Sequence, residues 1–276
     1  MKKILVPTDF SPQAENALKV AAQLARRFDG EIYLLHMLEL PLVLVDPVSG
    51  SGTSHLPEAL FFMKLAKKRF KELMAKDYLE GIKVYETVEF HQAFEGIMEI
   101  STKHKCDVII MGSHGATGLK EIFIGSNAEK VVINSIIPVL IIKNEHPEFV
   151  VNNFVFATDA NLENKHTLCK VKKFVEKFEA RLHLVYINTA NNFMNEAKAQ
   201  KNLEEFVEGE DLKNCTLNIY NDVTVEKGIL NFTNSINAEM IGISTHGRKG
   251  LSHFFNGSIS VDLVNHANMP IVTFKI

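Results

Sequence analysis

Short apolar runs alternate along the chain with longer segments whose apolar residues recur at helical spacing. The short runs are rich in β-branched residues, which favour buried strands, and the longer segments have the pattern of amphipathic helices. This alternation is typical of parallel strands joined by crossover helices. We predict strands in the first half at residues 3–7, 31–38, 82–88, 107–111 and 138–142. We predict strands in the second half at residues 151–157, 181–187, 215–220, 239–243 and 270–275.

The first helix has a clear sequence signal for its start. Ser11 is a natural N-cap, and Pro12 suits the first helical position, where a missing N–H costs nothing. Small apolar residues then recur on one face and predict a packing stripe, formed by Ala14, Ala17, Leu18, Ala21, Ala22, Leu24 and Ala25.

A basic run between residues 61 and 74 also has helical spacing. Its cationic residues are Lys64, Lys67, Lys68, Arg69 and Lys71. They alternate with apolar positions, which are Phe61, Leu65, Phe70, Leu73 and Met74. We predict an amphipathic helix with a solvated basic side and a packed apolar side. A surface for a protein partner or for nucleic acid is the alternative.

The chain contains an internal repeat. Residues 6–9 recur as 156–159, residues 111–119 as 243–251, and residues 137–142 as 269–274. Order and local spacing agree in the two halves, which chance explains poorly. We therefore predict two domains, residues 1–146 and 147–276, linked at His146-Pro147 because a residue before proline is pushed out of helix. The first half is longer, and its extra residues fall in Leu40–Pro57, whose Gly, Ser and Pro predict a mobile loop.

Composition fits two globular domains and excludes other classes of protein. The 276 residues are 46% hydrophobic and 23% charged, which argues against disorder and fibrous repeats. A formal net charge of −3 gives no positive field, so neither nucleic acid nor a membrane is expected as a partner. The first apolar run ends at Thr8-Asp9, too short for a signal peptide, and no run reaches the roughly 20 residues of a membrane span. Cys106, Cys169 and Cys215 lack CxxC spacing and fit a reducing compartment, so we expect a cytoplasmic protein.

The chemistry is expected at the carboxyl ends of the strands. In an open parallel sheet, ligands bind there at the point where the winding direction reverses. If the first and fourth strands are neighbours at that point, the loop with Thr8-Asp9 meets the loop from Gly112 to Ser126. The second loop has the spacing G-x2-G-x9-G-S and then enters a helix predicted at residues 127–135.

Glycines in such a loop favour the binding of an anion. They let the backbone approach a ligand closely, exposed amides point at phosphate oxygens, and the following helix adds the positive end of its dipole. Ser126 is a candidate helix N-cap and phosphate donor, and Lys120 or Lys130 would screen charge. The loop is not a Walker A motif, because no Gly-Lys-Ser/Thr follows the glycines. It is not a GxGxxG fingerprint either, since that motif follows the first strand.

These segments resemble the universal stress protein family. The resemblance rests on residues 110–115 and Gly125-Ser126, with Pro7-Thr8-Asp9 near the start and residues 137–140 near the end. It covers both halves, so the chain is similar to a tandem, two-domain member. The resemblance implies α/β architecture with two tandem, doubly wound, five-stranded parallel-sheet domains of the adenine nucleotide alpha hydrolase-like, Rossmann-like type. It also implies that the last strands of the two domains pair within one chain as a pseudo-dimer, and a homodimer of the whole chain stays open.

The glycine spacing is similar to that of the ATP-binding branch of the family, and the first half carries it intact. The resemblance implies an ATP site there, with or without magnesium, formed by Pro7, Thr8, Asp9, Met37, Met111, Gly112, Ser113, His114, Gly115, Gly125, Ser126 and Asn127. Asp9 and Met37 would lie by the adenine and ribose, and Met111 would line the pocket. The glycines, Ser126 and Asn127 would contact the ribose and phosphates.

The second half departs from this pattern at one position. Ser244 stands where Gly112 stands, and its Cβ and hydroxyl would enter space that close approach of a ligand uses. Gly247, Gly257, Ser258 and Asp159 remain. A second nucleotide site is therefore weakened but not excluded.

Several candidates have a plainer interpretation. Asp9 can cap the first helix through its carboxylate. His114 and His246 are best explained as loop histidines bonded to backbone, because no Ser-His-Asp order or HxxxH spacing accompanies them. Cys106 is most simply a small buried hydrophobe.

The sequence favours an ATP-binding regulatory protein of the stress-response type. Nucleotide occupancy would order the loop from Gly112 to Ser126 and alter a surface for an unidentified protein partner, which needs differential affinity but no covalent chemistry. We expect at most slow or partner-dependent ATP hydrolysis. The alternatives are a nucleotide-free interaction scaffold, and an ATP-cleaving or adenylating enzyme on a related fold.

Overall fold

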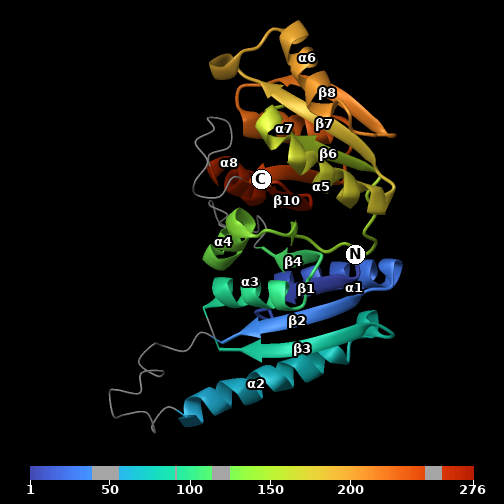
Figure 1. The fold of residues 1–276 in the computed structure, drawn as a ribbon. Helices are drawn as coiled ribbons and strands as arrows, with labels where there is room; N and C mark the ends of the chain where they lie inside the picture. The colour runs from blue at the N-terminus through green and yellow to red at the C-terminus, as the bar shows by residue number, and fades with distance from the viewer. Residues whose placement is uncertain (39–55, 91, 114–124, 246–256) are drawn as a thin grey trace. The chain divides into compact units, whose positions relative to one another are not determined.

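The computed structural model describes residues 1–38, 56–90, 92–113, 125–245 and 257–276 (Figure 1). The contacts within the chain divide it into two units, Met1–Gly112 and Ser113–Ile276. Each unit is built on a mostly parallel sheet with helices in the connections, so the fold is α/β, as the sequence predicts.

The described part of unit 1 contains a parallel sheet in the order β3-β2-β1-β4. The strands are β1 (Lys3–Pro7), β2 (Glu31–Met37), β3 (Lys83–Glu89) and β4 (Val108–Gly112). The helices are α1 (Pro12–Phe28), α2 (Leu56–Met74), the short 3-10 helix η3 (Asp77–Leu79) and α3 (Ala93–Lys103). The chain winds from β1 through β2 to β3 and then returns to the other side of β1, where β4 pairs with it. The winding therefore reverses between β1 and β4, which confirms the predicted adjacency.

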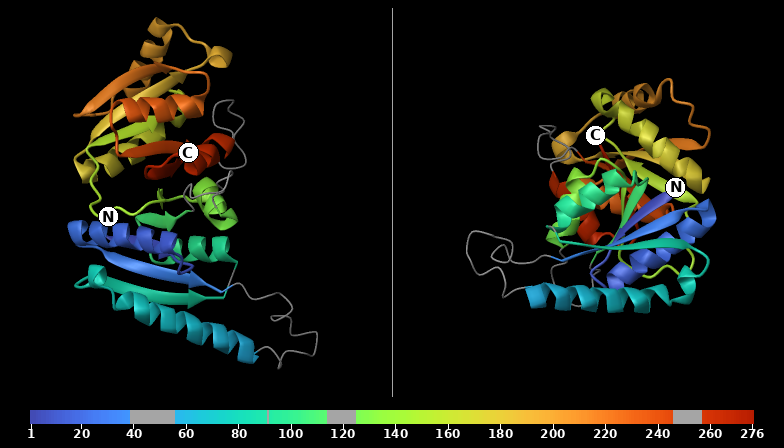
Figure 2. Two further views of the ribbon diagram at one scale, coloured as in Figure 1. Left: turned by 180° about the vertical axis from the view of Figure 1, so that it is seen from behind. Right: turned by 60° about the horizontal axis from the view of Figure 1, so that its bottom comes forward.

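The described part of unit 2 contains a sheet in the order β5-β10-β9-β6-β7-β8. The strands are β5 (Val139–Ile142), β6 (Asn153–Ala157), β7 (Arg181–Asn188), β8 (Cys215–Asn221), β9 (Met240–Thr245) and β10 (Ile271–Lys275). The α-helices are α4 (Ser126–Asn134), α5 (Lys165–Val175), α6 (Glu196–Val207), α7 (Val225–Ser235) and α8 (Gly257–His266). Short 3-10 helices lie at η4 (Leu162–Asn164), η5 (Glu176–Phe178) and η6 (Ala190–Asn192). Figure 2 shows α6 at the edge of this unit's sheet formed by β8, on which it packs.

The predicted strands agree with the observed ones to within two residues at each end. The last strands of the two repeats pair as predicted: β5 and β10 are antiparallel, with Leu140 opposite Val272. All the other pairs in the unit 2 sheet are parallel. The β5–β10 pair and the packing of α4 on α8, β9 and β10 explain why the contact division falls at Gly112. The domain boundary at residues 146 and 147 remains a prediction from the repeat.

One carboxylate in each unit ties the starts of two neighbouring strands together. In unit 1, Asp107 Oδ2 accepts hydrogen bonds from the amides of Lys2 and Lys3, at 2.6 and 2.9 Å. In unit 2, Glu239 Oε2 accepts from the amides of residues 152 and 153, at 3.0 and 2.7 Å. The repeat seen in the sequence is therefore also a repeat of side-chain contacts.

Helix α1 begins as the sequence predicts. Ser11 is its N-cap and its side chain accepts a hydrogen bond from the amide of Ala14, with Pro12 at the first helical position. The predicted packing stripe is buried throughout. Burial of this small-residue face lets α1 pack closely on β1 and β4.

Two predicted boundaries are wrong by one or two residues. Helix α4 starts at Ser126 rather than Asn127, and Gly125 is its N-cap, so the Ser126 side chain does not cap the helix. Leu56 and Pro57 belong to α2 and not to the predicted loop. The rest of that predicted loop, residues 40–55, lies outside the described residues.

The predicted packed side of α2 is partly wrong. Phe70 and Leu73 are buried, together with Ala66, but Phe61 and Leu65 are 62% and 39% exposed and Met74 is also exposed. Figure 1 shows why: α2 runs alongside the edge strand β3, so that the sheet covers one narrow face of the helix. Among the helices that are described, none combines the length and the apolar character needed to cross a membrane.

Thiol labelling distinguishes the three cysteines. Burial raises the pKa of Cys106 and of Cys215 to about 11, whereas Cys169 is exposed. At pH 8, Cys106 therefore holds on the order of a hundredfold less thiolate than an unshifted cysteine, and its burial also blocks access. We expect a maleimide to label Cys169 rapidly in the native protein and all three thiols only after unfolding, as peptide mass spectrometry will show. Rapid native labelling of Cys106 would contradict its assignment as a core residue.

Candidate functional site

The turn after β1 is held by its own polar side chains. The Thr8 amide donates to the carbonyl of Leu35 at 2.8 Å, and the Thr8 hydroxyl accepts from the amide of Phe10 at 3.0 Å. Asp9 Oδ1 accepts from the amide of Ser11 at 2.9 Å. These bonds hold Phe10 at a φ of 64°, in the left-handed region that non-glycine residues seldom adopt. Asp9 itself is exposed, so its side chain is accessible to solvent although the turn that carries it is fixed.

The same turn recurs after β6 in unit 2. The Thr158 hydroxyl accepts from the amide of Ala160 at 3.0 Å, and Asp159 Oδ1 accepts from the amide of Asn161 at 3.1 Å. Ala160 has a φ of 55°. Since strained backbone at equivalent positions persists where the surroundings hold it, the turn is a conserved element of the repeat within this chain. The first-helix cap is Ser11 in unit 1, so Asp9 fixes the turn rather than capping α1.

A cavity of about 150 Å³ lies beside this turn, at the carboxyl ends of β1 and β2. Asp9, Phe10, His36 and Arg69 contribute polar and aromatic groups to its wall. The remaining wall is formed by Leu38, Phe62, Leu65 and Ala66. The lining of the cavity therefore combines apolar side chains with one carboxylate and one guanidinium.

His36 and Phe10 join the turn to the strand and helix around it. His36 Nδ1 donates to the Thr8 carbonyl at 2.7 Å, which places the proton of the neutral ring on that nitrogen. The Phe10 ring lies 4.5 Å from the His36 ring and 5.1 Å from the Phe70 ring, centroid to centroid. The Arg69 guanidinium lies over Phe10 at 5.7 Å. The sequence did not identify His36, Phe10 and Arg69 as residues of this site. The turn itself could be recognised in the sequence, because its Thr-Asp pair recurs in the second repeat.

A wider hollow of about 420 Å³ continues along α2. It shares Phe10, Leu65 and Arg69 with the first cavity. It adds charged side chains, which are Glu15, Lys68, Glu72 and Lys76. Glu15 accepts a hydrogen bond from the Tyr78 hydroxyl at 3.2 Å and pairs with Lys76 at 3.4 Å. Burial and the neighbouring Glu15 raise the pKa of Tyr78, so this hydroxyl stays neutral at physiological pH.

The end of β4 is packed tightly against α1. A Cβ placed on Gly112 would lie 2.4 Å from the carbonyl carbon and oxygen of Gln13 and 2.6 Å from the amide nitrogen of Ala14. These are backbone atoms of the first turn of α1, so glycine is required here by the packing of the fold. Met111, just before it, is buried.

The helix start differs in the second repeat, where Ser244 stands at the position of Gly112. Leu162, which corresponds to Pro12, begins the 3-10 helix η4, and α5 starts only at Lys165. The α-helical first turn that crowds Gly112 in unit 1 is therefore absent from the equivalent place in the described part of unit 2. From the sequence, glycine was expected at position 112 because it leaves space for a ligand. The structure gives a second and separate reason, which is the close packing of α1 on the end of β4.

The other predicted site residues divide between the described segments and the rest of the chain. Pro7 ends β1, Met37 ends β2, and both are partly exposed. Ser113 is buried, and its hydroxyl has no hydrogen-bond partner among the described residues. Gly125, Ser126 and Asn127 form the start of α4. His114 and Gly115 lie outside the described residues.

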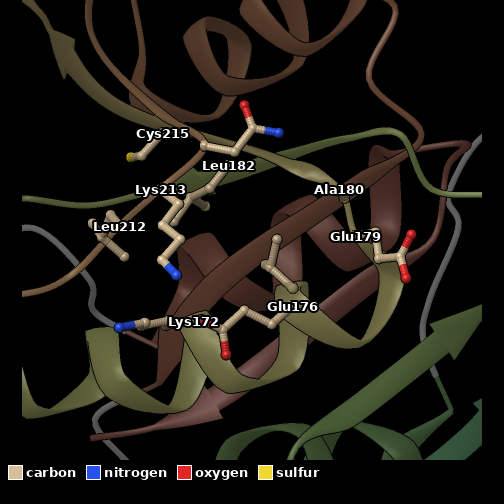
Figure 3. A pocket seen from close by; sticks show the side chains of 10 residues that line it. Lys172, Glu176, Glu179, Ala180, Leu182, Leu212, Lys213 and Cys215 are labelled. Carbon is tan, nitrogen blue, oxygen red and sulfur yellow. The ribbon is translucent and has the colours of Figure 1, made fainter.

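Unit 2 has a hollow of its own, of about 200 Å³, between the end of α5 and the starts of β7 and β8 (Figure 3). Its wall is largely apolar and includes Val175, Leu182 and Leu212, with Lys172 and Lys213 at the side. It lies at the amino ends of the strands, away from the carboxyl ends where parallel sheets bind ligands. None of the predicted site residues lines it.

The fold and the repeated turn define a class of protein: a duplicated α/β chain in which the same Thr-Asp turn follows the first strand of each repeat. The model of the universal stress protein family matches residues 1–143 and 151–275. The chain therefore belongs to the universal stress protein family.

Individual relatives agree with this assignment. The universal stress protein MJ0531 of Methanocaldococcus jannaschii is 36% identical over 154 residues, which cover 53% of this chain and 85% of the relative. The universal stress protein Slr1230 of Synechocystis is 24% identical over the full length of both chains. A crystal structure of a universal stress protein from Archaeoglobus fulgidus has a TM-score of 0.77 at 23% identity and covers 99% of this chain and 98% of its own, which supports the fold.

Proposed function

We propose that this universal stress protein is a regulatory protein that binds ATP in its first repeat. The observation that carries the proposal is the turn after β1, which holds the exposed Asp9 beside a cavity at the carboxyl ends of β1 and β2. The switch point of the sheet lies on the other side of the same strand, between β1 and β4. Ligands bind at such switch points in open parallel sheets. The intact glycine spacing of the first half supplies the elements of a phosphate-binding loop.

The residues that are present fit a nucleotide. Gly125, the N-cap of α4, has no side chain that bonds the amides of the first turn. This end of α4 suits a phosphate, because a helix N-terminus carries the positive end of the helix dipole. The buried Ser113 hydroxyl offers a further donor. Asp9 and Met37 are proposed to bind the base and ribose.

The proposed nucleotide acts as a switch rather than as a substrate that turns over rapidly. Among the described residues, no group of three His, Cys, Asp or Glu side chains is arranged to hold a metal ion. If magnesium accompanies ATP, the phosphates would supply part of its ligands. Binding would change a surface that a protein partner recognises.

Calorimetric titration of ATP tests the proposal. We expect wild type to bind ATP, Gly115→Val to lose that binding because a branched side chain fills the loop, and Gly247→Val to retain it as the matched change in the second repeat. Equal binding by all three proteins would overturn the assignment to the first repeat. Absence of binding by wild type would favour the nucleotide-free scaffold, and rapid formation of ADP or AMP would favour the enzyme.

A further inference from the structure

Two lysines make matching contacts across the repeat in unit 2. Lys275, the last residue of β10, donates from Nζ to the carbonyl of Ile133 at 3.0 Å. Lys143, which follows β5, donates from Nζ to the carbonyl of Asn265 at 2.6 Å. Lys143 and Lys275 follow equivalent residues of the repeated segments 137–142 and 269–274. In each repeat, the lysine that ends or follows the last strand therefore donates a hydrogen bond to the last helix of the other repeat.

Both contacts are made at the carboxyl end of a helix. Ile133 lies in the last turn of α4, and Asn265 lies in the last turn of α8. The last carbonyls of a helix lack partners within the helix, and an ammonium group there satisfies one of them and interacts favourably with the helix dipole. The two lysines therefore act as side-chain caps supplied from another part of the chain.

The surroundings hold these lysines in place. Lys143 is 6% exposed, and burial lowers its pKa to about 8; burial also lowers the pKa of Lys275. The backbone carbonyl of Lys275 in turn accepts from Nζ of Lys170 at 2.6 Å, which fixes the end of β10. A buried ammonium that bonds a carbonyl costs much to displace, because it would be left unpaired.

Helix α4 connects the two places that matter here: Lys275 contacts its last turn, and its first turn is the proposed phosphate-binding end. It is nine residues long, so the Ile133 carbonyl and the amides after Gly125 belong to one short, rigid element. A shift of its last turn would move its first turn by a similar amount. Phosphate binding at a helix start depends on where those amides point.

We propose that Lys275 is a positioning residue for the nucleotide site of the first repeat. By holding the last turn of α4, it sets where the Gly125-Ser126 end of that helix meets the phosphates. This inference rests on the proposed function. Lys143 holds the last turn of α8 in the second repeat in the same way. A change at Lys143 therefore serves as the matched control for a change at Lys275.

Nucleotide titrations test the inference in the Gly247→Val background, so that the first repeat alone is measured. We expect Lys275→Met to weaken ATP binding about fivefold, the size of a favourable charge interaction at a helix terminus. We expect Lys275→Arg to stay within about twofold of wild type because the guanidinium also donates to a carbonyl. Lys143→Met is expected to leave the affinity for ATP unchanged.

Adenosine separates a positioning role from a general loss of structure. It lacks the phosphates, so its affinity should be the same in wild type and Lys275→Met. Equal loss of adenosine and ATP binding, equal loss in Lys143→Met, or no loss in Lys275→Met would each overturn the inference.

Hydrogen exchange tests the contacts without any nucleotide. We expect Lys275→Met to raise exchange of the α4 amides and Lys143→Met to raise exchange of the α8 amides. Unchanged exchange in both variants would show that the lysines do not hold these helices, and would overturn the inference even if wild type binds ATP. If wild type fails to bind ATP but exchange changes as expected, the proposed function fails together with the nucleotide role of Lys275, and the helix contacts stand.

Discussion

Gly112→Ala is expected to lower the free energy of unfolding by about 3 kcal/mol, because the added Cβ has no room. It would lie 2.4 Å from backbone atoms of Gln13, and backbone in the first turn of α1 cannot move aside as the end of a flexible side chain can. The loss should appear in denaturant unfolding of the protein without nucleotide. Part of any loss of ATP binding in this variant would then come from the disturbed packing of α1 and not from a lost contact with the nucleotide.

Gly125→Ala is the matched control for this change. Among the described residues, no atom beyond Gly125 and its chain neighbours lies within 4 Å of a Cβ built on Gly125, and its φ of −55° suits alanine. We expect the free energy of unfolding to stay within about 0.5 kcal/mol of wild type. If Gly112→Ala and Gly125→Ala unfold at the same denaturant concentration, tight packing of α1 on the end of β4 is contradicted.

The fold was largely predictable because its signals are local. Buried parallel strands require continuous β-branched and apolar runs, and the crossover helices require helical spacing, so both can be read from short windows. The pairing of β5 with β10 is a long-range contact, and it was predicted only from the resemblance. The start of α4 was misplaced by one residue because Ser126 is a common N-cap type and the cap is instead Gly125.

The site was less predictable because its contacts are made between elements. Asp9 and the end of β4 were found from motifs. The left-handed Phe10, the His36 bond to the Thr8 carbonyl and the Arg69 contact with Phe10 depend on how β2 and α2 pack beside the turn. Contacts between elements also explain the wrong prediction for α2, where Phe61 and Leu65 were expected to be packed but are exposed. Helical spacing indicates that a helix has an apolar face, but it does not indicate how much of that face a neighbouring element covers.

Val272→Pro is expected to be the most damaging single change in unit 2. Val272 is fully buried in β10, where it lies opposite Leu140 on β5 and beside Gly242 on β9. Proline is excluded from the middle of a sheet because it lacks the backbone N–H. The buried carbonyl that it leaves unpaired is expected to cost up to about 3 kcal/mol, in addition to the lost packing of the valine side chain. Val272→Ala keeps the N–H and loses only side-chain packing, for which we expect about 2 kcal/mol. Urea unfolding of the two variants beside wild type separates the backbone effect from the packing effect.

The same pair of variants connects the sheet to the proposed nucleotide site. Because β10 carries Lys275, a break in its pairing should also release the last turn of α4. We therefore expect Val272→Pro to lose ATP binding in the first repeat, whereas Val272→Ala, with β10 still paired, keeps it within about twofold of wild type. Equal free energies of unfolding of the proline and alanine variants would contradict the pairing of β10 within the sheet at Val272. Full ATP affinity in a folded Val272→Pro protein would instead separate the nucleotide site from β10.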